Sequence, residues 1–86
     1  MSTIDNFMKL KNSLADYAHE AWSGWMKYMF SKSKKNEDGS VTIPKELVER
    51  WTRQMETPYE ELSKKEKKSD LEQADKILLT ISIVKY

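Results

Sequence analysis

The segment PYEELSKKEKKSDLEQADKIL, residues 58 to 78, decides the fold because it joins a turn to the start of a long helix. Proline fixes its backbone angle and cannot continue a helix, so Pro58 is expected to end one helix and begin a turn. Leu62 is expected to point inward as an apolar anchor. Ser63 and Glu66 have the spacing of a capping box, in which each side chain binds a backbone N–H of the other residue. The segment therefore predicts a helix that begins just after Ser63.

Apolar residues continue this helix toward the end of the sequence. Leu71, Ala74, Ile77, Leu78, Ile81 and Val84 fall on one helical face. Residues 81 to 83 alternate like a strand, but the periodic run before them favours a continued helix. Leu79 and Ile83 lie off the main face, so this end is apolar nearly all round and is expected to meet a second subunit.

Two further helices are predicted upstream. One covers residues 7 to 30, where apolar side chains recur at threes and fours, and Gly24 inside it implies either a bulky neighbour across it or a bend. The other begins near Pro44, which suits a first helical turn, and ends at Pro58. The sequence predicts an all-α fold, a single small three-helix domain over residues 1–86 with a long C-terminal helix.

Residues 31 to 42 contain Asp38-Gly39, a strong turn signal, among Ser, Lys and Asn residues. A mobile loop is expected here. A short hairpin is the less favoured alternative, and it would be supported by Val41 and Ile43, which alternate with Thr42.

Composition excludes several classes of protein. The 15 Lys and Arg residues nearly balance 14 Asp and Glu residues, so no strong positive field draws the chain onto nucleic acid. Absence of cysteine excludes a disulfide framework, a thiolate metal site and a cysteine nucleophile. The longest apolar run is too short for a membrane span, and no signal-peptide pattern opens the sequence. We expect a cytoplasmic protein that binds neither nucleic acid nor membrane and needs no cofactor or metal.

Aromatic and cationic residues supply the candidate binding site. The sequence has many large rings for so short a chain, namely Trp22, Trp25, Tyr28, Trp51 and Tyr59. Rings at the edge of a cleft can stack on a base. The more common outcome is that such rings fill the core. Arg50 and Arg53 flank Trp51, although Glu46–Arg50 and Glu49–Arg53 have the spacing of ordinary surface ion pairs. His19, the only histidine, is more often a half-buried hydrogen-bonding residue than a ligand contact. The lysines around Glu66 and in the loop are expected to be solvated.

Two motifs resemble the RyR domain, a small helical module of ryanodine receptors that is also found in bacteria and their viruses. LADYAHEAW, residues 14 to 22, is similar to the family's helix that ends in His-Glu-x-Trp. The segment from Pro58 is similar to its Pro-Tyr-x-x-Leu-x-x-x-Glu-Lys-x-x-Asp pattern, which reaches Asp70. Leu71 follows Asp70 where the family often has arginine, so a role of that arginine does not carry over. The resemblance implies a sensor of nucleotide-derived ligands, and in a phage a protein that withholds a host defence signal.

Three hypotheses follow. The first is a non-enzymatic protein that binds a nucleotide-derived molecule of the ADP-ribose or cyclic nucleotide type, with a pocket shared across a homodimer or higher homo-oligomer. The predicted ligand-binding residues are His19, Trp22, Trp25, Arg50, Trp51, Arg53, Tyr59 and Asp70. The second is an adaptor or inhibitor that docks on a host protein through its apolar C-terminal end. The third is an enzyme that hydrolyses a nucleotide signal with His19 as the base.

Overall fold

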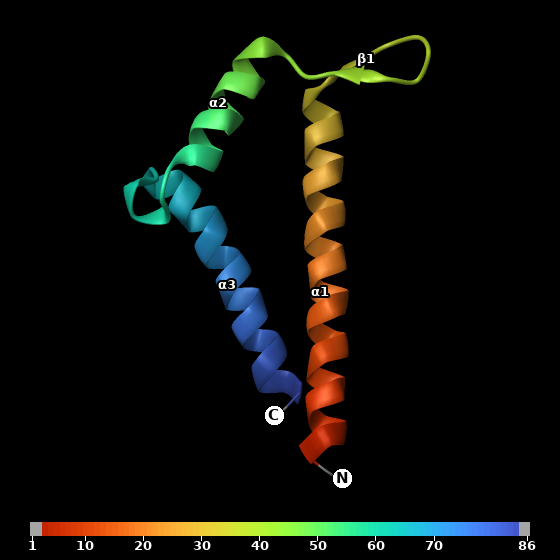
Figure 1. Cartoon of the computed structure of the whole chain (residues 1–86), viewed down its shortest axis with the longest axis vertical. Coiled ribbons are helices and arrows are strands. Elements are labelled where there is room, and N and C mark those ends of the chain that lie inside the picture. The colour runs from red at the N-terminus through yellow and green to blue at the C-terminus, as the bar shows by residue number, and fades with distance from the viewer. Residues whose placement is uncertain (1–2, 85–86) are drawn as a thin grey trace.

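The computed structural model describes residues 3–84 and confirms an all-α fold. Helix α1 spans Thr3–Lys32, α2 spans Lys45–Glu56 and α3 spans Lys64–Val84. Two short strands, β1 (Lys34–Lys35) and β2 (Val41–Thr42), separate α1 from α2, and a 3-10 turn, η1 (Tyr59–Glu61), precedes α3. The helices form an open frame in which the start of α1 and the end of α3 approach each other while the other ends diverge toward α2 (Figure 1).

The capping box at the start of α3 is confirmed. The backbone N–H of Glu66 donates to Ser63 Oγ at 3.2 Å, and the backbone N–H of Ser63 donates to Glu66 Oε1 at 3.3 Å. The hydroxyl of Ser63 also donates to Glu66 Oε1 at 2.9 Å. Two N–H groups that would otherwise lack partners at the helix end are thereby satisfied. Helix α3 then continues through Ile81, Ser82 and Ile83, as predicted.

Residues 31 to 42 correct the sequence-based prediction. We expected a loop, but β1 and β2 pair antiparallel, with Lys34 opposite Thr42. The Asn36 side-chain amide donates to the hydroxyls of Ser40 and Thr42 at 2.9 and 3.0 Å. Gly39 closes the turn with a φ of 91°, in the left-handed region that favours glycine. These polar contacts, which apolar patterning does not reveal, order the hairpin.

Neither consequence expected of Gly24 is found. Helix α1 passes through this position as one element, and Figure 1 shows no bend there. A Cβ atom added at Gly24 would meet no heavy atom within 4 Å, so no bulky neighbour packs across it. The glycine instead lies beside the open space between the helices.

The predicted apolar core does not form within one chain. Among residues 3–83, whose burial the structure describes, no side chain is buried. The molecule measures 53 × 36 × 16 Å, so it is flat rather than globular. Viewed down this shortest axis, the three helices lie beside one another rather than in stacked layers (Figure 1). One layer of helices leaves each helix in contact with solvent.

Two polar contacts connect elements that are distant in sequence. The hydroxyl of Tyr17 on α1 donates to the side-chain oxygen of Gln73 on α3, and it lies 3.4 Å from the Gln73 carbonyl oxygen. The guanidinium of Arg53 on α2 donates to Glu66 on α3 at 3.3 Å. These contacts fix the angle between the helices.

Replacing Tyr17 with phenylalanine is expected to lower the free energy of unfolding by about 1 kcal/mol, because Gln73 loses its partner across the α1–α3 contact. Urea denaturation at a fixed protein concentration measures the change. Tyr59→Phe is the matched control, since the Tyr59 hydroxyl makes no hydrogen bond within residues 3–84. Equal destabilisation by the two substitutions would contradict the proposed role of Tyr17.

Candidate functional site

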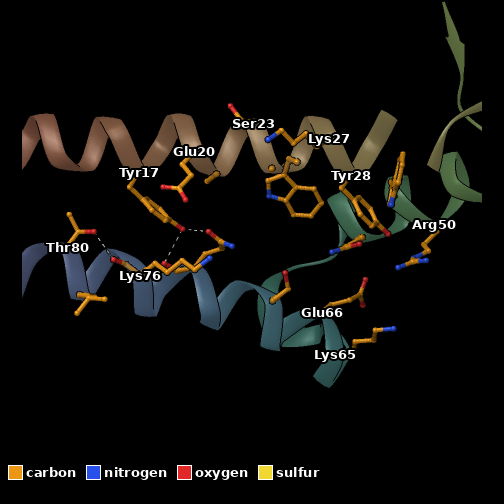
Figure 2. A pocket seen from close by; sticks show the side chains of 18 residues that line it. Tyr17, Glu20, Ser23, Lys27, Tyr28, Arg50, Lys65, Glu66, Lys76 and Thr80 are labelled. Atoms are coloured by element: carbon orange, nitrogen blue, oxygen red, sulfur yellow. Dashed lines mark hydrogen bonds between the residues drawn. The ribbon is translucent and has the colours of Figure 1, made fainter. Parts of the chain in front are cut away.

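A hollow of about 830 Å³ lies between the facing sides of α1, α2 and α3 (Figure 2). Its volume is within the roughly 300–1,000 Å³ typical of small-molecule sites. Its walls are lined by residues at helical spacing. On α1 these include Tyr17, Ala21, Gly24 and Tyr28, and on α3 they include Ser69, Gln73, Lys76 and Thr80. The lining side of α3 is therefore a mainly polar stripe, with Leu79 as its one apolar side chain, and it suits a water-filled or ligand-filled space rather than an apolar contact.

Three aromatic rings form the wall near α2. Tyr28 stands between Trp25 and Trp51, with ring centroids 6.1 Å and 6.2 Å away. The Trp25 and Tyr28 rings meet edge to face at 89°, a favourable arrangement for aromatic pairs. The ammonium of Lys32 lies 5.7 Å from the centre of the Tyr28 ring. Trp25 is half exposed at 50 %, so its ring retains a surface on which a ligand can stack.

Positive charge gathers at the same end of the hollow. Arg50 and Lys65 line it there, whereas Tyr17, Lys76 and Thr80 lie at the opposite end (Figure 2). The ion pair predicted between Glu46 and Arg50 does not form.

Within residues 3–84, Arg50 has no ion pair, whereas Lys45 pairs with Glu49 at 3.9 Å and Arg53 pairs with Glu66. The predicted pair of Glu49 with Arg53 is therefore also wrong. An unpaired guanidinium beside aromatic rings is suited to a planar, anionic ligand.

Glu66 is the acidic residue at the end of the hollow that carries Arg50 and Lys65, and its carboxylate already has hydrogen-bond and ion-pair partners. Its side chain is 14 % exposed and interacts with Ser63 and Arg53. The hydrogen bond from the Ser63 hydroxyl is the main reason that the pKa of Glu66 lies below its ordinary value of 4.5, and the Arg53 guanidinium adds to the effect. Glu66 thus stays ionised at neutral pH, with Ser63 and Arg53 as its partners.

A second, smaller hollow of about 420 Å³ adjoins the first. Trp25 and Trp51 line both, and Tyr59 and Asp70 line only the second. The ammonium of Lys67 lies 5.7 Å from the centre of the Tyr59 ring. The two indole rings therefore form a partition between the two spaces.

Of the eight residues predicted to bind a ligand, the structure gathers five around these two hollows. They are Trp25, Arg50, Trp51, Tyr59 and Asp70. His19, Trp22 and Arg53 line neither. The half-buried environment expected for His19 is wrong, because its side chain is exposed and stacks on Trp22 with ring centroids 6.1 Å apart. The pair lies at i, i+3 on α1, which accounts for the stacking.

Sequence reasoning missed much of the lining, including Tyr17, Glu20, Lys65, Gln73 and Lys76. A signal was present in the polar residues of α3 at 69, 73, 76 and 80, which recur at helical spacing opposite the apolar face. Such a stripe resembles an ordinary solvated surface until a second helix lies across from it.

Within the described residues, no group of three or more His, Asp or Glu side chains is arranged to hold a metal ion. No helix in residues 3–84 is long and apolar enough to cross a membrane.

No family model matches the chain, and neither a curated protein nor a solved structure is significantly similar to it. The resemblance to the RyR domain therefore remains a hypothesis based on two motifs.

The lowered pKa of Glu66 predicts an acid-sensitive fold. Because the folded protein binds this proton less tightly than the unfolded chain, Glu66 contributes stability above pH 4.5, and this contribution is lost as pH falls through the lowered folded pKa. The free energy of unfolding should therefore fall more steeply for the wild-type protein than for Glu66→Gln. Urea denaturation between about pH 6 and about pH 3 tests this. Parallel curves for the two proteins would contradict it.

Proposed function

We propose that the chain is a non-enzymatic binding protein for a small anionic molecule with a flat ring, of the nucleotide-derived class. The observation that carries this proposal is the unpaired Arg50 guanidinium at the aromatic end of the 830 Å³ hollow. In this arrangement Trp25 or Trp51 stacks on the base, and Arg50 binds a phosphate with two parallel hydrogen bonds. Lys65 adds a second positive charge at the same end (Figure 2).

A binding role is favoured over catalysis by the position of His19. The enzymatic hypothesis needs this histidine as a base beside the ligand, and a general base must lie within hydrogen-bond reach of the proton that it removes. His19 lines neither hollow. The polar stripe on α3 supplies hydroxyl, amide and ammonium groups that suit ribose hydroxyls and phosphates.

The finer identity of the ligand rests on the resemblance to the RyR domain. That resemblance motivates a phage protein that acts in the host cytoplasm and withholds an immune signal of the ADP-ribose or cyclic nucleotide type. The hollow supports the chemical class, a ring joined to phosphate, and an 830 Å³ space is large enough for either kind of molecule.

A protein adaptor is the second candidate. It would dock through exposed apolar side chains, and the C-terminal half of α3 carries several, such as Leu78 and Ile83. The fold of one chain leaves these apolar side chains uncovered, so they are also the surface through which two copies of the chain could pack. We therefore favour a second copy of the chain over a foreign protein as their partner.

Isothermal titration calorimetry against ADP-ribose, cyclic AMP and related nucleotides tests the binding proposal. The controls are inorganic phosphate, which lacks the base, and adenosine, which lacks the phosphate. We expect a nucleotide to bind and to change the tryptophan fluorescence. Arg50→Ala should weaken binding by about tenfold or more, because a hydrogen-bonded charge pair is lost.

Lys68→Ala is the control and should leave the affinity near that of the wild type, since Lys68 is an exposed cation of α3 that lines neither hollow. The proposal fails if no nucleotide of the panel binds, or if Arg50→Ala and Lys68→Ala weaken binding equally.

A further inference from the structure

The strongest unexplained feature is an apolar stripe on α3 that faces away from the chain's own helices. Leu71, Leu78 and Ile81 lie on the predicted core face, yet they are 53 %, 64 % and 38 % exposed. None of the three lines the hollow between α1 and α3, where the same helix presents its polar stripe. The amphipathic helix is thus turned with its polar side toward its neighbour and its apolar side toward solvent, the reverse of what a folded monomer requires.

The exposed surface of the whole chain is also too large for a monomer. A folded monomeric protein of this mass exposes about 5300 Å². The chain exposes 7308 Å². The radius of gyration is 17.3 Å, whereas a compact chain of this length has about 12 Å. The chain therefore exposes about 2000 Å² more surface than a compact monomer of the same mass. We expect a partner to cover this surplus surface.

The missing part is a second layer. Domains are stable when two layers of secondary structure enclose a core between them, and this chain supplies one layer. The C-terminal half of α3 shows the need most clearly, because Ile77 and Ile83 add to its apolar surface and are 39 % and 69 % exposed. A helix with this much apolar surface is normally enclosed by other helices.

We infer that the occupant of this surface is a second copy of the chain, which packs its α1–α3 layer on that of the first. If each copy buried its surplus surface of about 2000 Å² in the interface, the dimer would bury about 4000 Å² in total. Obligate homodimer interfaces bury roughly 2000–5000 Å². A two-fold axis places the α3 stripe of one copy against that of the other, so the interface is self-complementary. With a net charge of +1 per chain, the copies do not repel each other strongly.

The dimer is independent of the proposed ligand. The apolar stripe and the polar stripe lie on different sides of α3, so a second layer covers the first while the hollow lined by the second remains. Failure of nucleotides to bind would leave this inference intact, and a monomeric protein would leave the ligand proposal intact.

Sedimentation equilibrium of the purified full chain, without added ligand, tests the inference. We expect twice the 10.2 kDa mass of one chain and a melting temperature that falls as the protein is diluted, because folding is coupled to association. A folded species with the mass of one chain, whose melting temperature does not change on dilution, would overturn the inference, whether or not it binds another protein.

Leu78→Glu separates the dimer from an extended monomer. In a monomer Leu78 is an exposed surface residue, and its substitution should change stability little. In the dimer it introduces a charge into the interface, so dimerisation and cooperative unfolding should both be lost. Lys68→Gln, which changes the net charge by the same one unit at an exposed position of α3, should retain the wild-type mass and melting temperature. A wild-type mass and melting temperature for Leu78→Glu would contradict the inference.

Discussion

Three helices in a single layer cannot enclose a core, and this constraint governs the rest of the structure. A helix is stabilised mainly by burying its apolar face, because hydrogen bonding along a short helix is only marginally favourable in water. Here α1 and α3 are joined by a polar contact between Tyr17 and Gln73, while α2 is joined to α3 by Arg53 and Glu66. Such contacts bury little apolar area, which is why we infer that a second copy of the chain supplies the stabilising burial.

The same constraint explains the hollow. If α1 and α3 met through apolar side chains, the space between them would be closed and dry. They meet instead through a polar stripe and diverge toward α2 (Figure 1), which leaves Trp25, Trp51 and Arg50 beside open space. An aromatic surface next to a guanidinium without an ion pair offers two kinds of contact to a ligand. A nucleotide would satisfy both groups, because its base stacks and its phosphate accepts hydrogen bonds.

Local signals in the sequence predicted most of the secondary structure. The capping box at Ser63 and Glu66 and the period of α3 involve residues within one or two turns of each other, so they are readable without the fold. The hairpin at residues 34–42 was ranked below a loop because side-chain hydrogen bonds of Asn36 and Ser40 order it, and such bonds leave no periodic pattern. In the site, Trp25, Arg50 and Trp51 were found by residue type, whereas Gln73 and Lys76 look like ordinary surface residues until α1 lies opposite them.

The sequence by itself determined the helical class, the starts of α2 and α3, and the apolar face of α3, since propensity, capping and periodicity are properties of short segments; α1 runs from Thr3 to Lys32, beyond the predicted residues 7 to 30. Only the tertiary structure decided which face of α3 meets α1, that Arg53 rather than Arg50 is paired, and that no apolar side chain in residues 3–83 is buried within one chain. The physical reason is that an amphipathic pattern identifies a helix face that is stabilised by removal from water. The pattern does not specify whether the same chain or another copy covers that face.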